Sequence, residues 1–259
     1  MLDLQQAQLV AATAARRAGA LINKAYAARA VTVSRVKSPG DLATETDARA
    51  ERIIRDHLRD AYPDHAVLGE EEGQRGDSPC RWIVDPLDGT MNFVHGLPYF
   101  AVSLALEIEG RVRLAVVHDP VTGGLYTARE GGGAYRNGRI VRVSTATDLA
   151  SALIGTVAPP PTWPEMPDFL RRFGALCRGA AGVRRMGAAA LDLAGVAGGR
   201  LDGFFVMNLK LWDVAAGGLL VTEAGGLVAP LPGVREEERG VRIVAGAPGV
   251  MEALLRVLA

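Results

Sequence analysis

The sequence predicts a layered α/β or α+β fold, in which helices pack against mixed β-sheets. Two observations support this prediction. Segments with helical spacing of apolar residues and segments with strand-like alternation are mixed along the whole chain of 259 residues. Apolar residues make up 49% of the sequence, which is enough for a large buried core. We place a subdomain boundary near residue 145, because the proline-rich connection that follows separates two differently patterned halves, residues 1–145 and 146–259.

The first elements are expected to be two helices. Residues 4–30 are rich in Ala, Leu and Gln and contain no proline, which predicts one long helix with a break near Gly19. The second helix is expected to begin at Thr46 or Asp47, either of which can cap it, and to end at Tyr62, which precedes a proline.

Strands are expected next. Residues 67–68 predict a short strand, and residues 100–108 alternate between large apolar side chains and small or polar ones, which predicts a strand with one large apolar face. Turns at 109–110 and 137–138 join neighbouring strand segments, and Asn-Gly at 137–138 is a strong hairpin signal. The strands that these turns connect are predicted at residues 112–117, 125–128 and 140–143.

The second half mixes helices and strands. Its helices are predicted at residues 168–177, 188–197, 214–224 and 249–258, and its strands at 204–207 and 241–245. Gly225 is expected to end the third of these helices as a C-terminal cap, and Pro248 to start the last one.

Charge and cysteine content exclude several classes of protein. Lys plus Arg (29) equals Asp plus Glu (29), so no basic field favours nucleic acid as a partner. Two cysteines, Cys80 and Cys177, do not form a disulfide framework. The N-terminus has no basic region typical of a signal peptide, and no apolar run is long enough for a membrane span. We therefore expect a cytoplasmic protein with no membrane association.

The most informative segment runs from Trp82 to Thr90. An apolar run ends in two carboxylates three residues apart, Asp85 and Asp88. Pro86 restricts the backbone between them, and Gly89 frees it just after them. Such a turn presents several oxygens to one point, as Mg²⁺ requires. Taken alone, the segment is also compatible with an ordinary structural turn, because Asp-Pro and Asp-Gly are common turn dipeptides.

Three further acidic segments have equally plain alternatives. Residues 41–47 contain a potential helix cap, residues 70–72 are three consecutive glutamates typical of a solvated loop, and Asp213 lies at the start of a predicted helix. None of the segments indicates a metal site by itself.

Together the segments resemble the inositol monophosphatase family. The matching segments occur in the family's order: Asp41 to Asp47, Gly69-Glu70-Glu71, Trp82 to Phe93, and Trp212-Asp213-Val214-Ala215-Ala216 with Ala224-Gly225-Gly226. The resemblance extends from about residue 37 to residue 228. It implies an alternating α-β-α-β-α sandwich of the inositol monophosphatase and fructose-1,6-bisphosphatase type. It also implies a homodimer.

The resemblance assigns roles to residues. The expected metal ligands are Glu70, Asp85, the Leu87 carbonyl, Asp88 and Asp213, holding two or three Mg²⁺ ions. Most of these ligands belong to the N-terminal subdomain, whereas Asp213 and the substrate pocket belong to the C-terminal one. The expected catalytic residues are Asp47, Glu70 and Thr90, which orient the attacking water. The expected substrate-binding residues are Asp88, Gly89, Thr90, Thr156, Ala189, Val206 and Lys210.

The implied activity is Mg²⁺-dependent, lithium-sensitive hydrolysis of a small phosphate monoester by a metal-activated water, without a covalent intermediate. Inositol 1-phosphate or a related sugar or polyol phosphate is the expected substrate. Inositol-specific members have a Glu seven residues before the late Asp, where this chain has Val206, which cannot accept a hydrogen bond from a hydroxyl. Histidinol phosphate and nucleotide 3′-phosphates remain alternative substrates, and a regulatory role associated with RNA or transcription remains an alternative function.

Overall fold

The computed structural model describes residues 2–29, 31–38, 41–160, 162–233 and 240–259. Its helices, in chain order, are α1 (Leu4–Ala27), α2 (Glu45–Ala61), α3 (Thr90–His95), α4 (Met166–Gly179), α5 (Ala189–Ala197), α6 (Leu211–Glu223) and α7 (Pro248–Leu258). Within the described ranges, no helix combines the length and the apolar character that crossing a bilayer requires.

The strands form two large sheets and one hairpin. An eight-stranded sheet has the order β10-β9-β8-β7-β6-β5-β3-β4 and contains β3 (Ala66–Gly69), β4 (Gly73–Arg75), β5 (Cys80–Asp88), β6 (Ala101–Ile108), β7 (Arg111–Asp119), β8 (Gly124–Arg129), β9 (Gly133–Arg136) and β10 (Arg139–Ile140). A five-stranded sheet has the order β12-β11-β13-β15-β14 and contains β11 (Leu153–Val157), β12 (Gly182–Arg184), β13 (Gly203–Leu209), β14 (Leu227–Pro230) and β15 (Val241–Gly246). The separate antiparallel hairpin pairs β1 (Val33–Ser38) with β2 (Asp41–Thr44).

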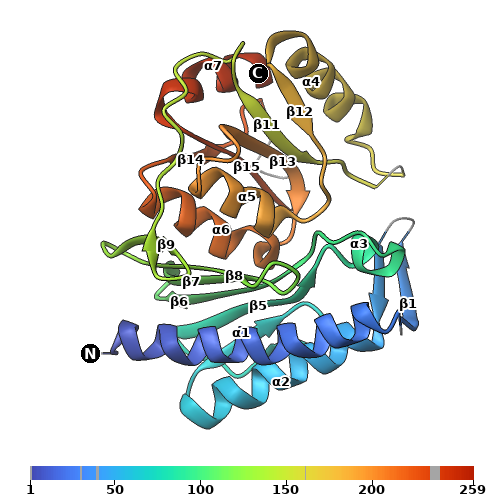
Figure 1. The fold of residues 1–259 in the computed structure, drawn as a ribbon, viewed down its shortest axis with the longest axis vertical. Coiled ribbons are helices and arrows are strands. Elements are labelled where there is room, and N and C mark those ends of the chain that lie inside the picture. Colours follow the sequence, from blue (N-terminus) through green and yellow to red (C-terminus); the bar gives the residue numbers. More distant parts are fainter. Residues whose placement is uncertain (1, 30, 39–40, 161, 234–239) are drawn as a thin grey trace.

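The elements stack in five alternating layers (Figure 1). Helices α1 and α2 cover the outer face of the eight-stranded sheet, α5 and α6 lie between the two sheets, and α4 and α7 cover the outer face of the five-stranded sheet. The predicted fold class is therefore confirmed. The division into two subdomains near residue 145 stays a prediction, although it falls between the last strand of the first sheet and the first strand of the second.

Two expectations for the N-terminal helices were wrong. Helix α1 continues through Gly19 without a break. The glycine lets α1 approach β7 closely, because a Cβ at this position would lie 2.5 Å from Cδ2 of His118. The cap of α2 is Thr44, whose side chain accepts hydrogen bonds from the Thr46 and Asp47 amides. Asp47 is instead the third helical residue and completes a capping box with Thr44.

Strand β6 explains the spacing of the layers. Its large side chains, Val102, Leu104 and Leu106, form the predicted large apolar face and share a buried core with residues of α1 and α2. The opposite face is also buried, and it carries Ala101, Ser103 and Ala105. Small side chains on that face let α6 approach the sheet closely, so both faces of the strand belong to the core.

The predicted hairpin turns are confirmed. Glu109 and Gly110 have φ values of 51° and 76°, and Asn137 and Gly138 have φ values of 49° and 76°. Two consecutive positive φ values are the signature of the type I′ turn that joins antiparallel strands. Several short elements were not predicted from the sequence, namely β1, β2, β4, β9, β11, β12, β14 and α3.

Two adjacent glycines of α6 should respond oppositely to alanine. A Cβ on Gly217 would lie 2.5 Å from Cβ of Leu193 in α5, whereas a Cβ on Gly218 would meet no atom within 4 Å. Gly217→Ala is therefore expected to destabilise the protein by about 1–3 kcal/mol through overpacking, and Gly218→Ala to stabilise it by up to about 1 kcal/mol through helix propensity. Urea unfolding measures both changes. Equal effects of the two substitutions would contradict the close packing of α5 on α6.

Candidate active site

A cavity of about 260 Å³ lies where the two large sheets and the helices between them meet. Its walls come from the ends of several elements rather than from one segment. The loop after β3, the end of β5, helix α3, the segment after β11, the end of β13 and the start of α6 all contribute. Groups far apart in the sequence are thus brought to one opening.

All five predicted metal-ligand residues line this cavity, namely Glu70, Asp85, Leu87, Asp88 and Asp213. The local geometry of β5 explains how two of them face the same way. In a regular strand, residues three apart point to opposite faces. The pairing of β5 with β6 shifts register between Asp85 and Asp88, so the Pro86–Leu87 segment forms an irregularity that restores a common direction. Pro86 has no N–H to lose from the ladder at that point.

Backbone amides hold three of the carboxylates in place. The Leu87 amide donates to Oδ1 of Asp85 over 3.0 Å. Asp88 accepts hydrogen bonds from the amides of Ala189 (3.2 Å) and Ala190 (2.7 Å) at the start of α5. The Lys210 amide donates to Oδ2 of Asp213 over 2.7 Å, at the start of α6. Each acid is therefore oriented while its remaining lone pairs stay available to a ligand.

The acids raise one another's pKa values. Burial raises the pKa of Asp85 well above its ordinary value, and the charges of Glu70, Asp88 and Asp213 raise it further. Burial and the charge of Asp213 likewise raise the pKa of Asp88. A bound divalent cation would relieve this repulsion, and an all-oxygen donor set suits Mg²⁺ better than a soft metal.

The donor set does not form a closed cage. Among the residues that the structure describes, no three His, Cys, Asp or Glu side chains are grouped as a ready-made metal site. The chemistry of the donors nevertheless fits Mg²⁺.

Thr90 and Asp47 form a second arrangement next to the acids. Oγ1 of Thr90 lies 3.0 Å from Oδ1 of Asp47 and 2.9 Å from the carbonyl oxygen of Leu87. Asp47 is fully buried, and its other carboxylate oxygen accepts hydrogen bonds from the amide (2.9 Å) and the hydroxyl of Thr44. Burial raises the pKa of Asp47, while these hydrogen bonds oppose the shift. The side chain of Asp41, the first residue of the same motif, lies outside the described part of the chain.

Gly89 connects the acids to Thr90 and needs to be glycine. Its φ is 90°, and a Cβ would lie 3.0 Å from the carbonyl oxygen of Tyr99. Gly89 and Thr90 both line the cavity. Their position agrees with the phosphate-binding role that the sequence predicts for them, a role that stays a prediction.

The remaining predicted substrate-binding residues divide into two groups. Ala189 and Lys210 line the cavity. Thr156 and Val206 are fully buried and do not belong to its lining, so the structure does not support contacts between these two residues and a substrate. The alternation of β13 places the side chain of Val206 with that of Phe204, in the core between the sheets.

The lining residues that were not predicted from the sequence include three with large polar or aromatic side chains, Trp163, Arg185 and Asn208. Trp163 lies among the prolines of the connection that follows β11, and Arg185 follows β12. Asn208 lies at the irregular end of β13 with a φ of 62°, a conformation that Asn tolerates better than most residues. No local pattern marks these residues, because long-range packing brings them to the cavity.

A buried acid beside the site, Asp192, should make stability depend on pH. It accepts a hydrogen bond from the Tyr99 hydroxyl over 2.7 Å, and burial raises its pKa to about 7. Between pH 4 and 7 the folded state therefore keeps a proton that the unfolded state has released, so this group lowers stability progressively as pH rises through that window. Asp192→Asn should stabilise the protein by roughly 1–4 kcal/mol at pH 8 and by less at pH 5. Urea unfolding with a chelator present measures this, and an equal gain at both pH values would contradict the assignment.

Comparisons with known proteins agree with this geometry. A family model described as the inositol monophosphatase family matches residues 3–258. Nus factor SuhB of Escherichia coli (strain K12) is 44% identical over 248 residues, covering 95% of this chain and 93% of that protein. The inositol-1-monophosphatase of Rhizobium meliloti (strain 1021) is 45% identical over 225 residues, covering 86% and 85%. The crystal structure of extragenic suppressor protein suhB from Bartonella henselae superposes with a TM-score of 0.92 at 41% identity, covering 98% of each chain.

Proposed function

Because the chain belongs to the inositol monophosphatase family, a family of phosphatases, we propose that it hydrolyses a small phosphate monoester with Mg²⁺ as cofactor. The observation that carries this proposal is the shared cavity. Four carboxylates and one carbonyl, all oxygen donors, line it together with the Thr90 hydroxyl. Asp47 lies within hydrogen-bond distance of that hydroxyl.

The carboxylates of Glu70, Asp85, Asp88 and Asp213 and the Leu87 carbonyl would hold Mg²⁺. When bound, Mg²⁺ supplies positive charge to the phosphate oxygens and lowers the pKa of a coordinated water. Two or three ions are proposed, since one Mg²⁺ balances only two of the four negative charges of these mutually repelling acids.

The remaining residues would position water and phosphate. Thr90, with its proton donated to Asp47, can accept a proton from the attacking water, and Glu70 assists in orienting that water. The amides of Gly89 and Thr90 would bind phosphate oxygens. Among the described residues that line the cavity there is no Ser, Cys or His, and the carboxylates and Thr90 have proposed roles as metal ligands and in positioning water, which favours direct attack by water over a covalent intermediate.

The proposed substrate is inositol 1-phosphate or a related sugar or polyol phosphate. The name of the Rhizobium meliloti relative supports it. Hydroxyl groups of the alcohol would meet Arg185, Asn208 and Lys210, which line the cavity in place of an acid at position 206. A ring-bearing alcohol, as in histidinol phosphate or a nucleotide 3′-phosphate, could instead pack against Trp163 and the neighbouring prolines.

A phosphate-release screen tests the proposal. The panel contains inositol 1-phosphate, histidinol phosphate and a nucleoside 3′-phosphate, each with Mg²⁺, with chelator, and with Mg²⁺ plus Li⁺. We expect Mg²⁺-dependent release that Li⁺ inhibits, with the highest kcat/KM on the polyol phosphate. Absence of release from every monoester would refute the proposed activity.

A regulatory function is the second candidate, because several relatives, among them the Escherichia coli protein at 44% identity, are named Nus factor SuhB. The balanced charge of the chain had argued against nucleic acid as a partner, and that argument loses its support beside such names. Nucleic acid that co-purifies with both the wild type and Asp85→Asn would favour a role independent of catalysis. The homodimer stays a prediction, which light scattering tests, and so does the cytoplasmic location.

A further inference from the structure

Helix α2 carries a buried stripe of charged side chains. Asp47, Glu51 and Arg55 follow one another at intervals of four residues, so they lie on one face of the helix. Their exposed fractions are 0%, 0% and 7%. Charged side chains are almost never buried so completely unless they are paired, so each member requires an explanation by its contacts. The hydrogen bond with Thr90 explains the burial of Asp47. Glu51 and Arg55 have no role in the proposed catalytic mechanism, so their burial needs another explanation.

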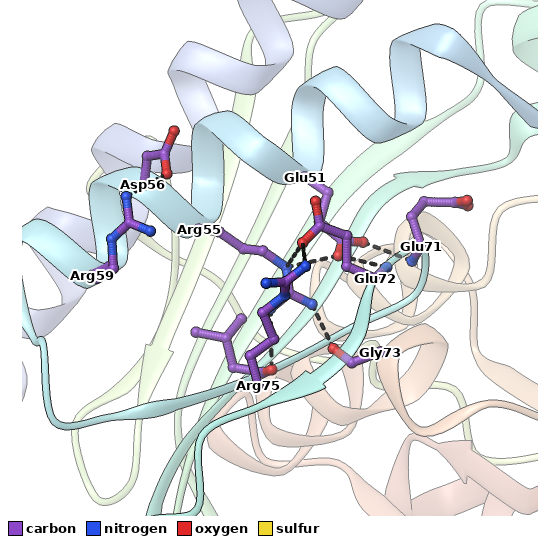
Figure 2. Close-up of polar contacts among 9 residues, drawn as sticks. Glu51, Arg55, Asp56, Arg59, Glu71, Glu72, Gly73 and Arg75 are labelled. Atoms are coloured by element: carbon purple, nitrogen blue, oxygen red, sulfur yellow. Dashed lines mark hydrogen bonds and ion pairs between the residues drawn. The ribbon is translucent and has the colours of Figure 1, made fainter.

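Glu51 binds the loop that immediately follows Glu70. One of its carboxylate oxygens accepts a hydrogen bond from the Glu71 amide over 2.8 Å, and the other accepts one from the Glu72 amide over 3.0 Å (Figure 2). Both amides belong to the turn between β3 and β4, whose first residue, Glu70, lines the cavity. The carboxylate therefore fixes the backbone directly after a proposed metal ligand.

Arg55 neutralises Glu51 and holds the strands on either side of that turn. Its Nε lies 2.8 Å from Oε1 of Glu51. Its two terminal nitrogens donate to the carbonyl oxygens of Val67 in β3 (3.3 Å) and Gly73 in β4 (2.5 Å). Figure 2 shows the guanidinium of Arg55 between Glu51 and the Gly73 carbonyl. The ion pair thus contacts the turn at its amides and both flanking strands at their carbonyls.

The packing around this ion pair leaves little freedom. A Cβ on Gly69, the last residue of β3, would overlap with Oε1 of Glu51 and would lie 2.7 Å from Nη2 of Arg55. At the start of the turn, the Glu70 amide donates a hydrogen bond to the Val84 carbonyl of β5 over 3.2 Å. Glu70 is therefore held between the strand that carries Asp85 and the helix that carries Asp47.

We propose that Glu51, with Arg55 as its counterion, is a positioning residue that sets the Glu70 loop for metal binding and fixes its place relative to the Asp47–Thr90 pair. The inference rests on the proposed function, because it assigns Glu70 to the metal site. A buried ion pair contributes little net stability compared with apolar packing, so stability alone is a poor explanation for its presence. Holding two catalytic elements with one rigid helix is a role that apolar side chains could not perform, because they cannot accept hydrogen bonds from backbone amides.

Glu51→Gln tests the inference with little change in volume. The two amides bond to different carboxylate oxygens and Gln has only one, so it cannot accept both hydrogen bonds in place. Among the described residues, it also leaves Arg55 with only the more distant carboxylate of Glu72, at 3.9 Å. We expect Mn²⁺ binding, titrated by electron paramagnetic resonance, to weaken by about 10-fold, as for other residues that orient metal ligands. The Mg²⁺ concentration for half-maximal phosphate release should rise by the same factor, with a smaller change in kcat at saturating Mg²⁺.

Asp56→Asn is the matched control. It also changes an acid to its amide on α2 and removes an ion pair, Asp56–Arg59 at 2.7 Å, but both side chains are more than half exposed and make no contact with the turn (Figure 2). Its Mn²⁺ affinity should stay within about 2-fold of the wild type, since exposed ion pairs contribute little. A Gly69→Ala variant, which displaces the ion pair without removing it, should reproduce the loss seen for Glu51→Gln.

The outcomes separate the inference from the function beneath it. If Glu51→Gln and Gly69→Ala lower the melting temperature but bind Mn²⁺ as the wild type does, measured well below unfolding, the ion pair is only structural and the inference is overturned. If the wild type itself binds no Mn²⁺ and releases no phosphate, the proposed function fails as well. Weakened Mn²⁺ binding in both variants, with a normal control, supports the positioning role.

Discussion

Asp85→Asn is expected to reduce Mg²⁺-dependent phosphate release by about 10²–10³-fold, the largest loss that any single substitution considered for this protein should cause. A metal ion supplies about 3–4 kcal/mol of transition-state stabilisation, and each 1.36 kcal/mol corresponds to a factor of ten in rate. Asp85 is 1% exposed and lines the cavity with three other acids, so water cannot substitute for its carboxylate as a charged metal ligand. The measurement is kcat/KM for phosphate release at saturating Mg²⁺.

Stability distinguishes lost chemistry from lost folding in this variant. Burial and neighbouring acids raise the pKa of Asp85, so its charged form is unfavourable when no metal is bound. Asp85→Asn should therefore leave the metal-free protein at least as stable as the wild type. Mg²⁺ should raise the melting temperature of the wild type and raise that of the variant less. The exposed acid Asp60 provides the control, since Asp60→Asn should retain activity. Near-wild-type turnover by Asp85→Asn would refute the metal-site assignment.

The parts of the fold that the sequence predicted are those whose cause is local. The turns at 109–110 and 137–138 follow from residues that tolerate positive φ, and α7 follows from Pro248 and a regular apolar pattern. The start of α2 was misplaced by a few residues, because Thr44, Thr46 and Asp47 can all cap a helix and only the packed structure selects among them. Short strands such as β4 and β12 carry too few residues for a periodic signal.

The candidate site divides in the same way. The acids are part of contiguous motifs, so their gathering at one cavity could be anticipated from the sequence. The positions of Arg185 and Asn208 in the cavity lining could not be anticipated, because the packing of separate elements brings these two residues there. Val206 shows the limit of position-by-position comparison. The side chain that replaces an acid belongs to the core, which is why we propose other residues for the contacts to the alcohol.

Thr90→Ala should reduce kcat by about 10²-fold, which is typical of lost proton-transfer assistance, with little change in KM. The Thr90 hydroxyl has one proton and two lone pairs. It lies within hydrogen-bond distance of both Asp47 (3.0 Å) and the Leu87 carbonyl (2.9 Å), so its proton is held on the protein side and its lone pairs can face a water in the cavity. Thr90→Ser keeps the hydroxyl and should retain most of the activity.

Asp47→Asn should lower kcat comparably, because it removes the charged acceptor that orients the Thr90 proton. The two residues should behave as one unit, so the double variant Asp47→Asn/Thr90→Ala should be no slower than about the slower single variant. Thermal unfolding of each variant separates this effect from the loss of the α2 cap, because Asp47 also accepts a hydrogen bond from the Thr44 amide. Multiplicative losses in the double variant would mean that the two side chains act independently, and the proposed orientation of the attacking water by this pair would then be wrong.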